Sequence, residues 1–180
     1  MSTSKSQRFG IWVIAIVLAI GTLAGFAAMI LTPSNDASDQ KKAQEAYQKQ
    51  VEEAAKANKP LKGYSAAAFD ADSVKKLKVE TLKQGTGKAA KADSTVTANY
   101  FGWDASGKIF DSTNKNGTTT PIDFGLSQVI TGWTEGLTGV KEGSTVKLTI
   151  PADKAYGNTD QGNGQPVGPL VFVVELKKVK

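Results

Sequence analysis

Hydrophobic residues follow two different patterns along this chain. No charged residue occurs from Ile11 to Leu31, in the run IWVIAIVLAIGTLAGFAAMIL, whereas from about Val74 apolar and polar residues alternate between turn residues. An uncharged helix of this length, rising about 1.5 Å per residue, matches a hydrocarbon core of roughly 30 Å. Alternation with a period of two is typical of half-buried β-strands. The pattern therefore predicts a transmembrane helix over residues 11–32 and a β-rich domain over residues 75–180.

The charges that flank the apolar run predict its orientation. Lys5 and Arg8 precede the run, and Asp36 and Asp39 follow it before any lysine. Because positive charges favour the cytoplasmic side of a membrane, residues 1–10 should be cytoplasmic and the β-rich domain beyond the run extracytoplasmic. A buried core helix is one alternative, but such a helix normally keeps a polar face. A cleaved signal peptide, which would give a secreted protein, is the other, but its apolar run is usually only roughly 7–15 residues long.

Two connecting segments are predicted between the apolar run and the domain. Residues 33–60 are rich in Ala, Gln, Glu and Lys, and nothing breaks a helix before Asn58, so they are interpreted as a helical spacer with a narrow apolar stripe. A solvated stalk is favoured, with a weakly self-associating coil or association with other membrane proteins as alternatives. Residues 61–74 lack clear periodicity and are interpreted as a linker able to lay Tyr64 or Phe69 against the domain.

Period-two alternation predicts the strands of the domain. In STVTANYFGW, the side chains of Val96, Ala98 and Tyr100 fall on one face of a strand and the intervening ones on the other. Further strands are predicted in LKVETLK, KIFDST, STVKLTIP and PLVFVVELKKV. Turns are predicted from Asp104 to Gly107 and at Asn116-Gly117.

One short helix completes the predicted domain. Ile130, Trp133 and Leu137 are spaced for a single helical face, and Gly139 and Gly143 follow as breaks. A short helix against a curved antiparallel β-sheet gives an α+β fold. From spacing alone, Trp133 is a core side chain.

The composition excludes several classes of chemistry. The 180 residues include neither cysteine nor histidine, which excludes disulfides, thiolate nucleophiles and Ser-His-Asp or Cys-His catalysis and leaves any metal site to carboxylates. The net charge of +5 is spread along the chain, with no basic helix interleaved with stacking aromatic residues, which argues against nucleic-acid binding. With 40% hydrophobic and 22% charged residues, the chain is globular rather than disordered.

Four ordered blocks of sequence carry a family resemblance: VTANYFG, GKIFDST, QVITGWTEGLTGVKEGSTVKLTIPADKAYG and PLVFVVEL. Together they resemble the FK506-binding (FKBP) class of peptidyl-prolyl cis-trans isomerases from about Lys78 to Val179. In that family a curved antiparallel sheet wraps one short helix, and a shallow apolar pocket between them receives a proline ring. The resemblance therefore implies an FKBP-like fold and rotation of Xaa-Pro bonds without a cofactor or a metal.

The resemblance also implies roles for individual residues. Trp133 would be the floor of the pocket beneath the prolyl ring, and its walls and rim would come from five further residues: Tyr100, Phe110, Phe172, Val129 and Ile130. The Ile130 backbone amide would bind a substrate carbonyl. Asp111 would lie at the pocket edge beside Tyr100, and Tyr156 would donate its hydroxyl to a substrate carbonyl.

Each of these residues also has a plainer interpretation. Trp133 and Phe172 suit ordinary core packing, Asp111 suits a strand-end carboxylate, and Tyr156 suits a surface aromatic. The stretch GNTDQGNGQPVG is interpreted first as a flexible loop, and only the resemblance makes it a flap over the substrate. The four blocks in family order favour the functional interpretation of Trp133.

Two stretches depart from the family pattern. Where the family commonly has two aromatic residues before a Leu-Gly pair, this chain has TTPIDFGLSQ, so Thr120 and Ile122 replace ring walls and Asp123 adds a charge. The loop after Tyr156 has small and polar residues around Asn163 in place of a bulky aliphatic pair. One side of the pocket is therefore expected to be more open or more polar, which would weaken the binding of macrolide inhibitors.

These features together predict a membrane-tethered peptidyl-prolyl cis-trans isomerase that acts on proline-containing segments of exported polypeptides. The alternative is a non-catalytic module or tethered chaperone that holds such segments in the same apolar site. The joint presence of Trp133, Tyr100, Asp111 and Tyr156 favours the enzyme. Rotation about an Xaa-Pro bond makes and breaks no covalent bond, so a dry aromatic site can promote it without a nucleophile.

Overall fold

The computed structural model describes residues 42, 45–46, 49, 53, 57–160 and 164–180. The segment 1–10 and the membrane span predicted over 11–32 lie outside these residues, and none of the described helices is long and apolar enough to cross a membrane. The described positions of the spacer before Asn58 are helical. Val51–Lys180 forms a compact unit that holds every strand of the described chain.

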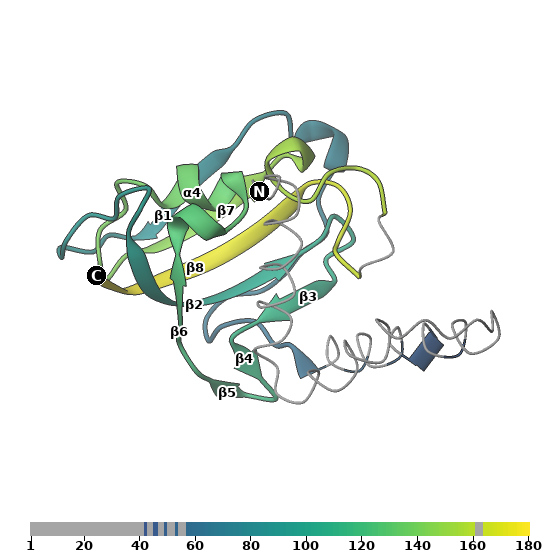
Figure 1. Ribbon diagram of the computed structural model, residues 1–180. Coiled ribbons are helices and arrows are strands. Elements are labelled where there is room, and N and C mark those ends of the chain that lie inside the picture. Colours follow the sequence, from purple (N-terminus) through teal and green to yellow (C-terminus); the bar gives the residue numbers. More distant parts are fainter. Residues whose placement is uncertain (1–41, 43–44, 47–48, 50–52, 54–56, 161–163) are drawn as a thin grey trace, which may run out of the picture. The chain divides into compact units, whose positions relative to one another are not determined.

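Six antiparallel strands form the main sheet of this unit (Figure 1). They are β1 (Lys78–Lys83), β2 (Thr95–Trp103), β3 (Ile109–Ser112), β6 (Ile122–Gly125), β7 (Thr145–Ile150) and β8 (Leu170–Val179). The order across the sheet is β1-β7-β8-β2-β3, and β6 pairs with β2 as well. β2 therefore lies between β8 on one side and both β6 and β3 on the other. The alternation of apolar residues predicts all of these strands except β6.

A small hairpin follows β3. Its strands are β4 (Asn114–Lys115) and β5 (Thr118–Thr119), which pair in antiparallel fashion. The two residues between them, Asn116 and Gly117, have φ angles of 52° and 92°. Two positive φ angles in a two-residue loop are typical of a type I′ turn, which favours Asn-Gly. The turn predicted at these residues is therefore confirmed.

The predicted short helix is present as α4 (Thr131–Leu137) and lies close to β7. Two glycines allow this approach: a Cβ at Gly132 would lie 2.3 Å from Cγ2 of Ile150, and one at Gly136 would lie 2.9 Å from Cδ2 of Leu148. Both distances are too short for a real side chain, so glycine sets the spacing between helix and sheet. Three 3-10 turns occur in the described part of this unit: η1 (Ala71–Ser73), η2 (Leu126–Gln128) and η3 (Ala152–Lys154).

The sheet carries apolar residues on both faces, because successive side chains of a strand point to opposite sides. The inner face, toward α4, holds the larger buried cluster, which includes Tyr100 and Phe172. The outer face holds a second cluster, made of Leu61, Phe101, Trp103, Val171 and Val173. As expected, Tyr64 and Phe69 pack against the domain, where they contact this outer cluster. The sheet plus one short helix confirms the predicted α+β arrangement of the domain.

Candidate active site

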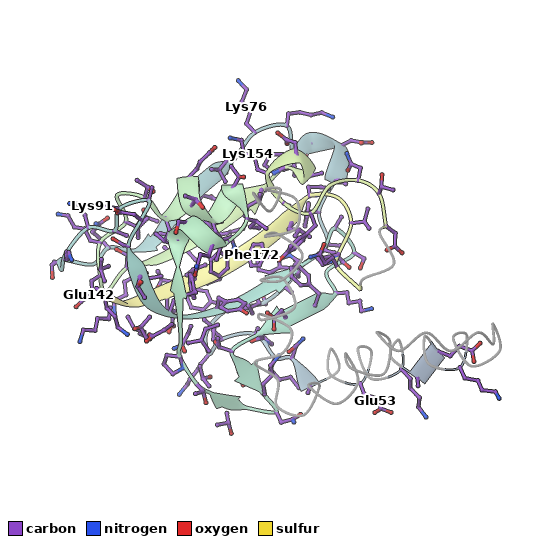
Figure 2. All side chains as sticks on the ribbon, in the orientation of Figure 1. Glu53, Lys76, Lys91, Glu142, Lys154 and Phe172 are labelled. Carbon is purple, nitrogen blue, oxygen red and sulfur yellow. The ribbon has the colours of Figure 1, made fainter. Side chains whose placement is uncertain are left out.

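Trp133 lies at the centre of a group of aromatic rings on the inner face. Its ring centroid is 5.1 Å from that of Tyr100, 5.2 Å from that of Phe172 and 5.1 Å from that of Phe124, and all three pairs meet edge to face. Phe172, near the middle of the sheet in Figure 2, also contacts Phe110, with 5.6 Å between ring centroids. Trp133 is 5% exposed, and its Nε1 has no hydrogen-bond partner among the described residues. Ring packing therefore fixes the indole, in a site that brings all the predicted aromatic walls together.

Gly102 of β2 makes room for two of these rings. It pairs with Phe172 of β8 on one side and with Asp111 of β3 on the other. A Cβ at Gly102 would lie 2.4 Å from Cε1 of Phe172 and 2.8 Å from Cζ of Phe110. Both rings therefore lie directly against the glycine backbone, a close approach that any larger residue would prevent. Sequence reasoning did not identify Gly102, although a lone glycine inside a strand pattern is a signal for such an approach.

A bulge in β3 turns two consecutive side chains toward the site. Gly102 pairs with Asp111 and Trp103 pairs with Ile109, which leaves Phe110 as an extra residue in β3. Ile109 packs against the outer cluster, whereas Phe110 packs against the inner one. A regular strand would send Phe110 and Asp111 to opposite faces, but the extra residue breaks the alternation. Both therefore reach the same site, as the family resemblance implies.

Three donors converge on the Asp111 carboxylate. Its Oδ2 accepts a hydrogen bond from the Tyr100 hydroxyl, and its Oδ1 accepts one of 2.8 Å from the Ser112 backbone N–H. Lys115 Nζ lies 3.2 Å from the same Oδ1 and forms an ion pair with it. The Asp111 side chain is 20% exposed, so a fixed negative charge lies at the border between the aromatic rings and solvent.

The two tyrosines of the site keep their protons at neutral pH. Burial raises the pKa of Tyr156 to about 12, and the charge of Asp111 adds to the shift. Burial, the Asp111 charge and the hydrogen bond to Asp111 raise the pKa of Tyr100 well above its usual value. Tyr156 packs against the inner cluster next to Ala155. Its hydroxyl is therefore a protonated hydrogen-bond donor beside the inner cluster.

Raising the pH from 10 to 12 should destabilise the wild type more than the Tyr156→Phe variant. A phenol in the unfolded chain ionises near pH 10, whereas the pKa of Tyr156 in the folded protein is about 12. The stabilisation that comes from the neutral, partly buried phenol is thus present below pH 10 and is lost as the pH rises through 12. Denaturant unfolding of both proteins at the two pH values measures the difference. Equal losses of unfolding free energy would contradict the packing of Tyr156 against the inner cluster.

Val129 and Ile130 lie at the start of α4, where the resemblance places the rim. Both are partly buried and pack against the inner cluster. Ile130 is the residue that caps α4, with φ −60° and ψ 148°, and its carbonyl accepts a hydrogen bond of 2.9 Å from the Trp133 N–H. No acceptor for the Ile130 N–H is found in the described part of the chain.

The stretch TTPIDFG differs from the expectation based on sequence. β6 pairs Phe124 with Val96 and Ile122 with Ala98, so both Phe124 and Ile122 face the inner cluster. Phe124 thus supplies an aromatic wall that sequence reasoning missed, although its alternation with Ile122 was a usable signal.

The expectation that Asp123 adds a charge to the site is wrong. Its carboxylate is exposed and bonds with Lys180 and Thr97, whose hydrogen bonds lower its pKa.

Other parts of the described structure do not extend the candidate site. Thr120 is exposed, and Asn163 lies outside the described residues. No group of three or more acidic residues suited to a metal ion occurs among the described residues. An open groove of about 1000 Å³ lies on the outer face, with Tyr64, Phe69 and Trp103 in its lining. The rings around Trp133 do not line this groove, so it is separate from the candidate site.

The segment that carries this site is similar to known proteins. Residues 86–177 match the family model described as FKBP-type peptidyl-prolyl cis-trans isomerase. The chain is 42% identical over 104 residues to "FK506-binding protein" of Neisseria meningitidis serogroup A, a match that covers 57% of this chain and 95% of that protein. It is 42% identical over 107 residues to "Outer membrane protein MIP" of Legionella longbeachae, covering 58% of this chain and 44% of that protein, so it spans less than half of this relative. A crystal structure of a peptidyl-prolyl cis-trans isomerase from Pseudomonas syringae matches with a TM-score of 0.52 and 32% identity, covering 76% of this chain and 96% of that chain.

Proposed function

Because the chain belongs to the FKBP-type peptidyl-prolyl cis-trans isomerases, we propose that it accelerates rotation about Xaa-Pro bonds at the rings around Trp133. One observation carries this assignment. A buried indole is enclosed by three edge-to-face aromatic rings, one of which, Tyr100, is hydrogen-bonded to a carboxylate at the solvent border. The family match supports the enzyme over the binding-only module.

The chemistry of the rotation suits these residue types. Turning an Xaa-Pro bond costs roughly 18–20 kcal/mol because amide resonance is lost in the twisted state. An apolar surface lowers this cost if it holds the proline ring and withdraws the water that stabilises the planar, charge-separated amide. Trp133 would support the ring from below, and Tyr100, Phe110, Phe124 and Phe172 would exclude water around it.

Two donors would hold the substrate backbone while the preceding carbonyl turns. The Ile130 N–H would bind one substrate carbonyl, and the Tyr156 hydroxyl would bind another. The raised pKa of Tyr156 supports this role, because the hydroxyl stays protonated over the neutral pH range. Asp111 would orient Tyr100 through their hydrogen bond and fix this wall of the site at the border with solvent.

NMR exchange spectroscopy on a short Xaa-Pro peptide tests the activity. With the full chain at micromolar concentration in detergent, the exchange between the cis and trans forms should be faster than without protein. An unchanged exchange rate would contradict the proposal. A macrolide inhibitor added to the same sample should slow the exchange only at high concentration, because Thr120 is exposed and Ile122 replaces a ring.

The cellular setting is a further part of the proposal. Residues 11–32 would anchor the chain in a membrane, and residues 33–57 would hold the domain on the extracytoplasmic side, where exported polypeptides fold. The lysine and arginine before the apolar run support this orientation. The similarity to "Outer membrane protein MIP" also supports a place in the cell envelope.

Protease treatment distinguishes the two orientations. In cells whose outer barrier has been opened but whose inner membrane is intact, protease should digest the isomerase domain and leave a short N-terminal fragment in the membrane fraction. Survival of the domain until the inner membrane is broken would contradict the orientation. Recovery of the intact domain in the soluble fraction, with a new N-terminus after residue 32, would instead indicate signal cleavage.

A further inference from the structure

The end of the predicted spacer docks on the strands next to the candidate site. The Lys59 N–H donates to the Asn114 carbonyl at 3.0 Å, and the Asn116 N–H donates to the Ala57 carbonyl at 2.9 Å. Side chains add to this pairing: Ser112 Oγ donates to the Lys59 carbonyl, and Asn114 Nδ2 donates to the Pro60 carbonyl, both at 2.7 Å. Residues 57–60 therefore lie along β3 and β4 as an additional edge of the domain.

Asn58 is the residue of this segment that reaches the site. It is 6% exposed, and both polar atoms of its side-chain amide are hydrogen-bonded. Nδ2 donates to the Phe110 carbonyl at 2.9 Å, and Oδ1 accepts a hydrogen bond from Lys115 Nζ. Phe110 is the bulged residue directly before Asp111. One buried amide thus holds both the backbone beside Asp111 and the cation that pairs with it.

Lys115 connects Asn58 to the carboxylate. Its ammonium group bonds to Asn58 and lies 3.2 Å from Asp111 Oδ1, while the other oxygen of Asp111 accepts from Tyr100. An ion pair between a half-exposed lysine and a carboxylate is normally weak, because the long flexible lysine side chain must be held in one conformation. A second, buried partner removes part of that freedom, since the ammonium is then fixed from two sides.

We propose that Asn58 is a positioning residue of the isomerase: its amide, itself anchored on the Phe110 carbonyl, holds Lys115, and Lys115 fixes Asp111 in the orientation that bonds Tyr100. The catalytic unit then begins within the segment predicted as spacer, and the docking of the spacer's end influences the rate. This inference rests on the proposed role of Asp111.

A double-mutant cycle on the full chain tests this positioning role. Asn58→Ala should lower kcat/KM by roughly three- to tenfold, as expected for residues coupled in one hydrogen-bond network. Lys115→Met, which keeps the aliphatic stem, should cause a loss at least as large. Because Asn58 acts through Lys115, Asn58→Ala should cause little further loss in the Lys115→Met background. Losses in kcat/KM that multiply in the double variant would overturn the proposal.

Asn114→Ala is the matched control. It removes a hydrogen bond to the same segment, at Pro60, but neither of the hydrogen bonds that the Lys115 ammonium makes to Asn58 and Asp111. It should leave kcat/KM within about twofold at a temperature where the unfolding curves show all variants folded. If Asn114→Ala lowers kcat/KM as much as Asn58→Ala, docking in general rather than the Asn58 amide controls the rate, and the proposal is wrong.

Measuring kcat/KM of an Asp111→Ala variant as well distinguishes failure of this inference from failure of the proposed function. If Asp111→Ala lowers kcat/KM and Asn58→Ala does not, the positioning role of Asn58 fails while the site assignment stands. If neither substitution changes kcat/KM, the role of Asp111 fails and the positioning role fails with it. If each single substitution lowers kcat/KM, and adding Asn58→Ala to Asp111→Ala causes no further loss, the positioning role of Asn58 and the role of Asp111 are both supported.

Discussion

Replacing Trp133 by alanine should lower the free energy of unfolding by roughly 3–5 kcal/mol, as is typical for a buried tryptophan, and should lower kcat/KM by about tenfold or more. The stability loss follows from three ring contacts around a side chain that is 5% exposed. The activity loss follows because the floor beneath the prolyl ring would be missing. Denaturant unfolding and peptide isomerisation, measured on the same sample, give the two quantities.

Trp103→Ala is the matched control for this prediction. Trp103 is 4% exposed and stacks on Phe101, but it belongs to the outer cluster. Its loss should destabilise the domain by a similar amount, roughly 3–5 kcal/mol, and leave kcat/KM within about twofold where both variants are folded. Equal loss of activity in the two variants would mean that instability alone explains the effect of Trp133→Ala.

Replacing Asp111 by asparagine should lower kcat/KM by roughly 10- to 100-fold. The substitution keeps the shape of the side chain but removes the charge that accepts hydrogen bonds from Tyr100 and pairs with Lys115. Hydrogen bonds to charged groups contribute about 1.5–3 kcal/mol, and each 1.4 kcal/mol corresponds to about tenfold in rate. Steady-state isomerisation rates at several peptide concentrations measure the effect on kcat/KM.

Asp123→Asn provides the comparison for Asp111→Asn. The Asp123 carboxylate also bonds to a lysine and a hydroxyl, but it is exposed and does not face the aromatic rings. Its substitution should leave kcat/KM unchanged within about twofold. A loss at Asp123 as large as that at Asp111 would indicate a general effect of charge rather than a site at Asp111.

Much of the domain could be predicted from the sequence because its elements are defined by local periodicity. The alternation of Val96, Ala98 and Tyr100 identifies the inner face of β2, and these residues are buried there. The spacing of Trp133 and Leu137 identifies the buried face of α4. The functional roles of the site residues come from the family resemblance, because spacing alone predicts only that Trp133 is a core residue. The structure shows that Trp133 does belong to the core.

The remaining features depend on pairing between distant segments, which local patterns do not encode. The bulge that turns both Phe110 and Asp111 inward follows from their register with β2. The sequence predicts Asn58 only as a residue that, with Pro60, ends the helical spacer. Its partners lie 52 and 57 residues away in the sequence. Only the folded arrangement shows that the spacer's end belongs beside the site.

The most direct measurement of the central claim is the contact between a bound proline ring and the indole of Trp133. Intermolecular NOEs from the proline ring of a short Xaa-Pro peptide should reach the Trp133 indole protons and the Phe172 ring, and they should disappear in Trp133→Ala. NOEs to Tyr64, Phe69 or Trp103 of the outer groove, with none to Trp133, would contradict the account.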